Sequence, residues 1–285
     1  MGTSASNTGP NNKSPLLPPW AEQGDPVGVG SGGDEEGDDG QKLPDKIEID
    51  NDKVQKKIPG PIPNIPSPNR LSGARKSFGD YAKSGGTGSN LRNSLKKYSK
   101  SSGGGAGTSR RLASGITAGS GLLGIMQGDN VRVSSRTLSL SDLNGLSVDQ
   151  AIDRITEHLT PENGDADSVR LALDFALAEA LPEEEAFNAS MFTDDVVQEA
   201  ISCYLADLIF QDIVNGMGKA WFHVEHPSKH HKMEEELRDL VKVITESKLE
   251  KVVGNNSGEI SQENITKIQI DVISQTVDEW ENFDD

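Results

Sequence analysis

Glycine and proline are distributed very unevenly along this chain of 285 residues, and their distribution limits where a packed core can form. Twenty-four of the 30 glycines and 11 of the 14 prolines precede Ser141. Glycine loses the most conformational entropy on folding, and proline lacks a backbone N–H group, so both disfavour the interiors of helices and strands. Only residues 141–285 therefore have the composition of an ordinary folded domain.

Charge divides the chain at similar points. The net charge is −5 over residues 1–65, +10 over 66–140 and −22 over 141–285, which gives −17 for the whole chain. Hydrophobic residues make up only 33%, whereas about 45–50% of a globular domain is apolar. We therefore expect a disordered tail over 1–68, a basic, glycine-rich helical segment over 69–140 and an acidic helical domain over 141–285.

The tail contains one short apolar island that ends in a tryptophan. It is followed by a glycine-rich and acidic stretch over 28–39, and then by prolines over 59–68 that favour extended geometry. The island is either a linear docking peptide for a partner or a loop that folds back on the chain itself. The candidate docking residues are Thr3, Ser4, Pro15, Leu16, Leu17, Pro18, Pro19 and Trp20.

The basic segment contains a repeat with a period of 17 residues. Residues 75–84 and 92–101 share the pattern R-x-S-[F/L]-x-x-Y-x-K-S. The two apolar positions of each copy lie three residues apart, which predicts two short helices that each have one apolar and one basic face. The candidate binding residues of this region are Arg75, Lys76, Tyr81, Arg92, Lys96, Lys97, Tyr98, Arg110 and Arg111.

Two partners fit this basic region. Its positive charge and tyrosines could bind a phosphate backbone and stack on bases, which makes a nucleic-acid-binding adaptor one alternative. The simpler account is that the region lies against the acidic half of the same chain or against an acidic partner. Both alternatives remain open from the sequence.

The next stretch, 112–128, is free of charge but is no membrane span. It is too short and too rich in small residues to cross about 30 Å of hydrocarbon, so we expect a closely packed helix and no membrane association through this segment.

Residues 141–285 follow a helical pattern almost throughout. Ser147 begins a capping box, Thr160-Pro161 is expected to cap a second helix, and Thr193 is expected to cap the longest one. Further apolar stripes predict helices from 233 to about 254 and from 265 to 280. Five helices without a convincing alternating run predict an all-α bundle.

Few residues of the chain suggest a catalytic, metal-binding or cofactor-binding site. Cys203 is the single cysteine, which suits a reducing, cytoplasmic location and a buried structural role. His223, His226, His230 and His231 are close in sequence, but Pro227 is expected to break the helix between them, which favours a solvated loop over a metal site. No catalytic arrangement or cofactor motif is recognisable, so we expect neither an enzyme nor a cofactor.

Gly2 is the most available nitrogen nucleophile. Removal of Met1 would expose its α-amine, whose pKa near 7.7–8.0 leaves roughly a tenth of it neutral at pH 7. The start also fits the N-myristoylation pattern, which would require a eukaryotic source, and an unmodified start is the third alternative.

Four features of the chain occur together: the Met1-Gly2-Thr3-Ser4 start, the peptide at 15–20, the basic repeats and an acidic helical half containing the sequence Glu-Leu-Arg-Asp-Leu-Val at 236–241. With these features the chain as a whole resembles the QatB family of bacterial Qat antiphage systems. The chain differs from the family in its acidic linker over 28–52.

The resemblance implies partners and a modification. The partners would be a QueC-like enzyme (QatC-type), an ATPase (QatA-type) and a TatD-like nuclease (QatD-type). QueC-type enzymes use ATP to activate a 7-deazaguanine carboxylate, and in related defence systems the acceptor is understood to be a protein's N-terminal amine. Gly2 would then be the modified residue of a non-enzymatic defence component.

Overall fold

The structure is a computed structural model that describes residues 69–84, 88–182, 185–222, 227–255 and 259–283. The chain divides into two units, 1–62 and 63–285, and every described residue belongs to the second. The predictions for Gly2 and for the peptide at 15–20 lie outside the described residues.

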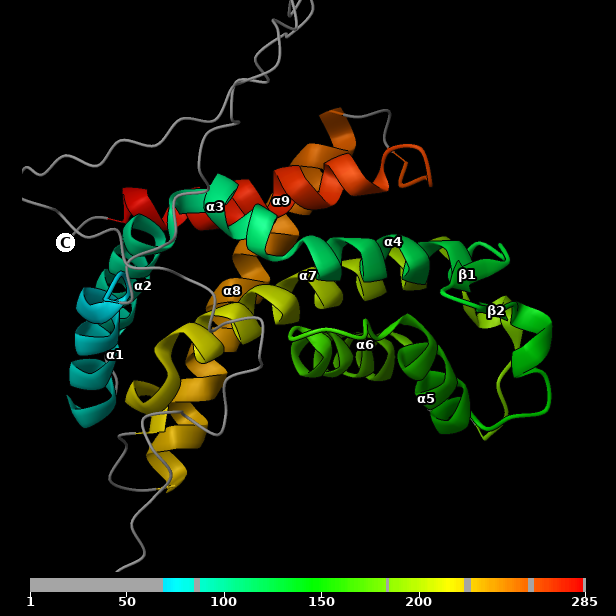
Figure 1. Ribbon diagram of the computed structural model, residues 1–285, viewed down its shortest axis with the longest axis horizontal. Helices are drawn as coiled ribbons and strands as arrows, with labels where there is room; N and C mark the ends of the chain where they lie inside the picture. Colours follow the sequence, from blue (N-terminus) through cyan, green and yellow to red (C-terminus); the bar gives the residue numbers. More distant parts are fainter. Residues whose placement is uncertain (1–68, 85–87, 183–184, 223–226, 256–258, 284–285) are drawn as a thin grey trace, which may run out of the picture. The chain divides into compact units, whose positions relative to one another are not determined.

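The described residues are predominantly helical, which confirms the predicted all-α class (Figure 1). The α-helices are α1 (Ser72–Ser84), α2 (Gly88–Ser102), α3 (Gly104–Arg111), α4 (Ala113–Met126), α5 (Val148–Leu159), α6 (Ala166–Ala180), α7 (Asp194–Met217), α8 (Pro227–Asn255) and α9 (Ile265–Glu279). Short 3₁₀ helices are η2 (Leu140–Leu143), η3 (Ala189–Met191), η4 (Gly218–Phe222) and η5 (Trp280–Asn282).

Helix α7 lies at the centre of the hydrophobic core. Every residue from 200 to 210 is buried, so this part of the helix has no solvent-facing side. It packs against α4, α6 and α8, and Figure 1 shows α4 and α6 on two sides of it. The same cluster of buried apolar residues includes members of α1, α2 and α9, so the basic repeat shares its core with the acidic helices.

The structure confirms two helix N-termini that capping residues predicted, those of α5 and α7. The Ser147 side chain accepts a hydrogen bond from the Gln150 backbone and the Gln150 side chain accepts one from Ser147, as in a capping box. Thr193 caps α7 through Val196.

The predicted first residues of two other helices were wrong. Helix α6 begins at Ala166 and not after Thr160-Pro161, because the Thr160 hydroxyl donates back to Thr156 at the end of α5 and Asn163 forms a turn with Asp165. Helix α8 begins at Pro227, well before the predicted start at 233. Proline is well tolerated at the first position of a helix, where its missing N–H group would have no helical partner.

A small β-hairpin was missed altogether. Strands β1 (Val131–Val133) and β2 (Arg136–Leu138) pair antiparallel, with Val131 opposite Leu138. Ser134 in the connection has a positive φ of 54°. Strands of three residues are too short for alternation of apolar and polar residues to reveal them.

The small residues of α4 allow close packing, as predicted. A Cβ atom on Gly119 would lie 2.1 Å from the side-chain oxygen of Gln269, and one on Gly115 would lie 2.5 Å from Leu208. Tyr204 donates to the Gly115 carbonyl at 2.7 Å, and Gln269 donates to the Ile116 carbonyl at 3.0 Å. Among the described residues, no helix is long and apolar enough to span a bilayer.

Candidate functional site: the basic repeat and its acidic contacts

The two repeat copies form α1 and α2, which pack against each other (Figure 1). Phe78 and Tyr81 of α1 and Leu95 and Tyr98 of α2 are at most 1% exposed. This confirms the predicted apolar face of each helix. Only three residues separate the helices in sequence, so they form a helical hairpin.

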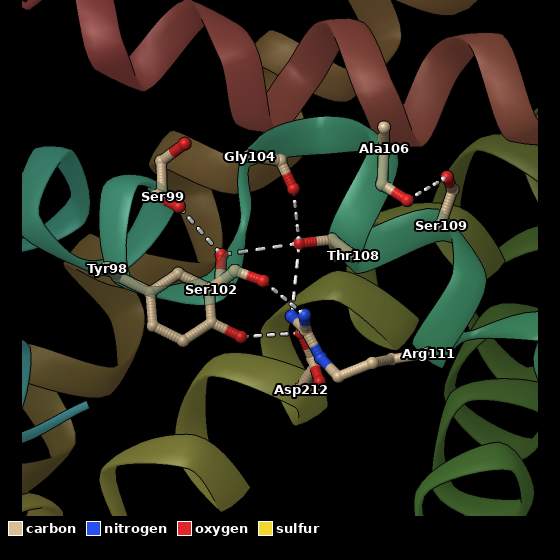
Figure 2. Close-up of polar contacts among 9 residues, drawn as sticks. All are labelled: Tyr98, Ser99, Ser102, Gly104, Ala106, Thr108, Ser109, Arg111 and Asp212. Carbon is tan, nitrogen blue, oxygen red and sulfur yellow. Dashed lines mark hydrogen bonds and ion pairs between the residues drawn. The ribbon is translucent and has the colours of Figure 1, made fainter. Parts of the chain in front are cut away.

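Asp212 of α7 joins the second repeat to the acidic helices (Figure 2). Its Oδ2 atom accepts a hydrogen bond from the Tyr98 hydroxyl at 2.5 Å and an ion-paired one from the Arg111 guanidinium at 2.8 Å. Arg111 also donates to the Ser102 carbonyl at 2.7 Å and to the Thr108 hydroxyl at 3.1 Å. One carboxylate near the C-terminal end of α7 therefore contacts the last turns of both α2 and α3.

Burial and charge perturb both partners of Asp212. Burial, followed by the charge of Asp212, raises the pKa of Tyr98 well above its usual value, because both disfavour the tyrosinate. Burial opposes the charge of Arg111, but its hydrogen bond and attraction to Asp212 outweigh this and raise its pKa. The cluster thus holds a neutral tyrosine and a charged arginine on one carboxylate.

The first repeat makes equivalent contacts to other elements. The Tyr81 hydroxyl donates to the Glu236 carboxylate of α8 at 2.8 Å, and Arg75 donates to the Gly216 carbonyl of α7 at 2.8 Å. Burial, followed by the hydrogen bond to Glu236, raises the pKa of Tyr81 above its usual range.

The end of the described chain also lies on α2. Lys96 donates to the Phe283 carbonyl at 2.9 Å, and the Arg92 guanidinium lies 5.6 Å from the centre of the Phe283 ring. The Ser99 hydroxyl donates to Glu281 at 3.0 Å.

The first turn of α3 is held by α9 in a similar way. The Gly105 amide donates to the Asp278 carboxylate at 2.7 Å, which places a negative charge at a helix N-terminus.

The segment 236–241 of α8 contributes to the contact between α7 and α8. Arg238 pairs with the buried Asp207 of α7, and its guanidinium lies 4.1 Å from the centre of the Phe210 ring and 4.7 Å from that of Phe175. Burial lowers the pKa of Arg238. This pair connects α8 to α7 near the Tyr81–Glu236 contact.

The structure separates the predicted basic site into two groups. Arg111, Tyr81 and Tyr98 contact acidic side chains of the same chain, and the two buried tyrosines offer no surface on which a base could stack. Lys76, Lys97 and Arg110 are exposed, whereas the exposed Arg75 and Arg92 and the half-buried Lys96 have the contacts described above. Binding of an external partner by these residues stays a prediction.

Sequence reasoning left out several residues of this arrangement. Asp212 and Glu236 could not be singled out among 45 acidic residues, since their contacts lie 114 and 155 positions away. Lys83 and Lys100 could have been included, because the repeat pattern places them on the sides of the helices opposite the buried residues.

Cys203 and the histidines form no recognisable centre among the described residues. Burial, followed by the hydrogen bond to Glu199, raises the pKa of the buried Cys203 thiol to about 12. His230 lies in α8, stacked on Phe222, and His231 pairs with Glu235. His223 and His226 lie outside the described residues, and within them no group of three or more potential ligands is arranged for a metal.

One surface pocket of about 550 Å³ lies where α4, α7 and α8 come together. Its ionisable residues are Asp194 and Glu259, and its apolar lining includes Phe192 and Val197. These groups offer carboxylates without a nucleophile beside them.

Comparison with known proteins matches most of this helical region to one family. The family described as "Qat anti-phage system associated protein QatB" matches residues 103–280, from α3 to α9 and more than half of the chain. No curated protein and no solved structure matches the chain.

Proposed function

Because the chain belongs to the QatB family of Qat anti-phage system proteins, we propose that it is a non-enzymatic defence component that a QueC-like partner binds and modifies at Gly2. Family membership makes the chain a component of an antiphage system and implies that other components of that system are its partners. The family match is the observation that carries the proposal. An ATPase and a TatD-like nuclease are further proposed partners of the helical region.

The proposed chemistry is the formation of one amide bond. The partner uses ATP to activate the carboxylate of a 7-deazaguanine, and the neutral α-amine of Gly2 attacks the activated carbonyl carbon. The activating group derived from ATP leaves, and the amine loses a proton as the C–N bond forms. At pH 7 roughly a tenth of an α-amine is neutral, compared with well under 0.1% of a lysine side chain, which favours Gly2 as the acceptor.

The apolar peptide at 15–20 supports a docking step before the chemistry. Proline restricts the unbound peptide, and Trp20 would supply a large apolar contact with the partner. Docking a short distance along the chain from Gly2 would raise the effective concentration of the amine at the partner's active site.

Mass analysis of the N-terminal peptide tests this proposal. The full chain is expressed with the active QueC-like partner and with a partner that cannot bind ATP. We expect a mass increase on Gly2 only with the active partner. Replacement of Trp20 by alanine should reduce the modified fraction, and the matched Val29→Ala change in the same region should not. An unmodified Gly2 with the active partner, or the added mass on Lys13, would contradict the proposal.

A further inference from the structure

Four lysines of the α1–α2 hairpin remain exposed and form no ion pair with the described residues. They are Lys76 and Lys83 of α1 and Lys97 and Lys100 of α2. Because the four ammonium groups are exposed, an external anion can reach them.

The repeat gathers these lysines on the side of the hairpin that faces away from the core. Both helices bury their corresponding apolar positions, so the lysines project from the opposite sides. Lys83 and Lys100 occupy the same position of the two copies. The two helices of a hairpin run in opposite directions, so Lys83 lies near the connection and Lys100 near the far end of α2. About 12 residues of helix separate these two levels, and packed helices lie about 8–10 Å apart, so the patch is about 18 Å long and about 10 Å wide.

The only acidic residue of the two helices moderates this patch. Asp80 is exposed on α1, between Lys76 and Lys83 along the helix face. The second copy of the repeat has Lys97 at the corresponding position. Of the exposed residues on this side of α1 and α2, four are lysines and one is acidic.

We propose that this lysine face, defined by Lys76, Lys83, Lys97 and Lys100, binds the phosphate backbone of duplex nucleic acid without sequence preference. A duplex presents closely spaced phosphates over a surface of this size, and lysine contacts phosphate as a point charge without reading bases. The tyrosines of the repeat are buried, so the face lacks the stacking surface that binding of single strands uses. The hairpin precedes the part of the chain that matches the family, residues 103–280.

Fluorescence anisotropy of the full chain with a labelled duplex of about 30 base pairs tests the proposal, over about 50–200 mM salt. A variant with all four lysines changed to glutamine should bind at least about tenfold more weakly at low salt, with the log–log slope of affinity against salt reduced by up to about 3.6. The matched control changes Arg170, Lys229, Lys251 and Lys267 to glutamine, which removes the same charge from exposed positions elsewhere. This control should bind like the unmodified chain.

A second variant tests for a gain of binding. Replacement of Asp80 by asparagine removes the negative charge from the lysine face and should tighten duplex binding. Circular dichroism checks that each variant keeps its helices.

Three results would overturn the proposal. The first is absence of duplex binding by the unmodified chain at low salt, and the second is equal loss of binding in the lysine-face and control variants. The third is tighter binding of a single strand, or of a poly-glutamate peptide, than of the duplex at matched charge, which would assign the face to another class of partner. None of these results bears on modification of Gly2.

Discussion

The Ser94 hydroxyl donates a hydrogen bond to the Ser77 hydroxyl at 3.0 Å, and these serines occupy the same position in the two copies of the 17-residue repeat. A contact between equivalent residues is what an approximate two-fold axis between α1 and α2 produces, by the same logic as in a symmetric dimer. The repeat in sequence thus corresponds to an internal symmetry of the hairpin.

Enlarging Ser94 should separate the two helices. Ser94 is fully buried, so a leucine there would overpack the contact with Ser77 and lower the free energy of unfolding by about 1–3 kcal/mol. Urea unfolding followed by circular dichroism measures this change. Ser94→Ala is the size-matched control and should cost less than Ser94→Leu; equal losses would argue against close packing at this position.

Removing the Asp212 carboxylate should destabilise the fold strongly. Asp212→Ala leaves the buried Tyr98 hydroxyl without its acceptor and the half-buried Arg111 without its ion-pair partner, which we expect to cost about 2–4 kcal/mol in urea unfolding. The exposed Asp239 is the control, and its replacement by alanine should change stability by less than about 0.5 kcal/mol. In a double-mutant cycle, Tyr98→Phe should couple to Asp212→Ala by about 1 kcal/mol. Additive effects would contradict the shared contact.

Removing the buried charge of Asp207 should destabilise the fold, because Asp207 pairs with Arg238 of α8. Asp207 is 1% exposed in its side chain, so Asp207→Asn removes the buried counter-charge of Arg238 and leaves only the partly exposed Glu234 carboxylate paired with the guanidinium. We expect a cost of about 3 kcal/mol. Thermal unfolding by calorimetry provides the measurement. Arg238→Lys keeps the charge but loses the planar stacking group, so it should also destabilise. A lysine variant as stable as the unmodified chain would show that charge alone suffices.

A methyl group at Gly105 should push α3 away from α9. Its Cβ atom would lie 2.2 Å from the Ser274 carbonyl oxygen, and backbone cannot give way as a side-chain end can. Gly105→Ala should therefore lower the free energy of unfolding by about 1–3 kcal/mol. Gly73→Ala is the matched control, because nothing lies within 4 Å of the added atom; it should be neutral or stabilise by up to about 1 kcal/mol. Equal effects would contradict close approach of the two helices.

All three tyrosines of the chain should make the protein sensitive to alkali. Burial is the largest cause that raises the pKa of Tyr81, Tyr98 and Tyr204 above the usual value near 10. The unfolded chain therefore loses these protons at lower pH than the folded chain does. Their contribution to stability is complete below about pH 10 and falls as the pH rises above it.

Absorbance of tyrosinate and circular dichroism, measured together from about pH 8 to 12, test this expectation. Tyrosinate should appear only as the helices are lost. Tyr81→Phe should remove about one third of the absorbance change, which separates the tyrosine signal from titration of lysines. Full tyrosinate absorbance near pH 10 with the helices intact would contradict the burial of these rings.

The local parts of the fold were predictable because the determining residues are neighbours in sequence. The spacing of Phe78 and Tyr81 predicted a buried helix face, and Ser147 and Thr193 predicted helix starts that the structure confirms. The prediction for Thr160 was wrong because its hydroxyl bonds to the preceding helix. The β-hairpin was missed because each strand has only three residues.

The contacts of the candidate site were not predictable in the same way. The Tyr98 hydroxyl donates its hydrogen bond to Asp212 and not to another carboxylate because of how α2, α3 and α7 pack together. The same packing divides the bases into those with contacts inside the chain and the exposed lysines of α1 and α2.

By itself, the sequence determined the helical class, the faces of most helices and the division of charge, since each follows from residues within a few turns of one another. The tertiary structure decided which acidic residues bind the repeat and which lysines stay exposed. These depend on helix pairs such as α3 and α9, where Gly105 lets two backbones approach closely enough for Asp278 to reach a helix N-terminus. Approach of this kind involves residues 173 positions apart, beyond the reach of any local pattern.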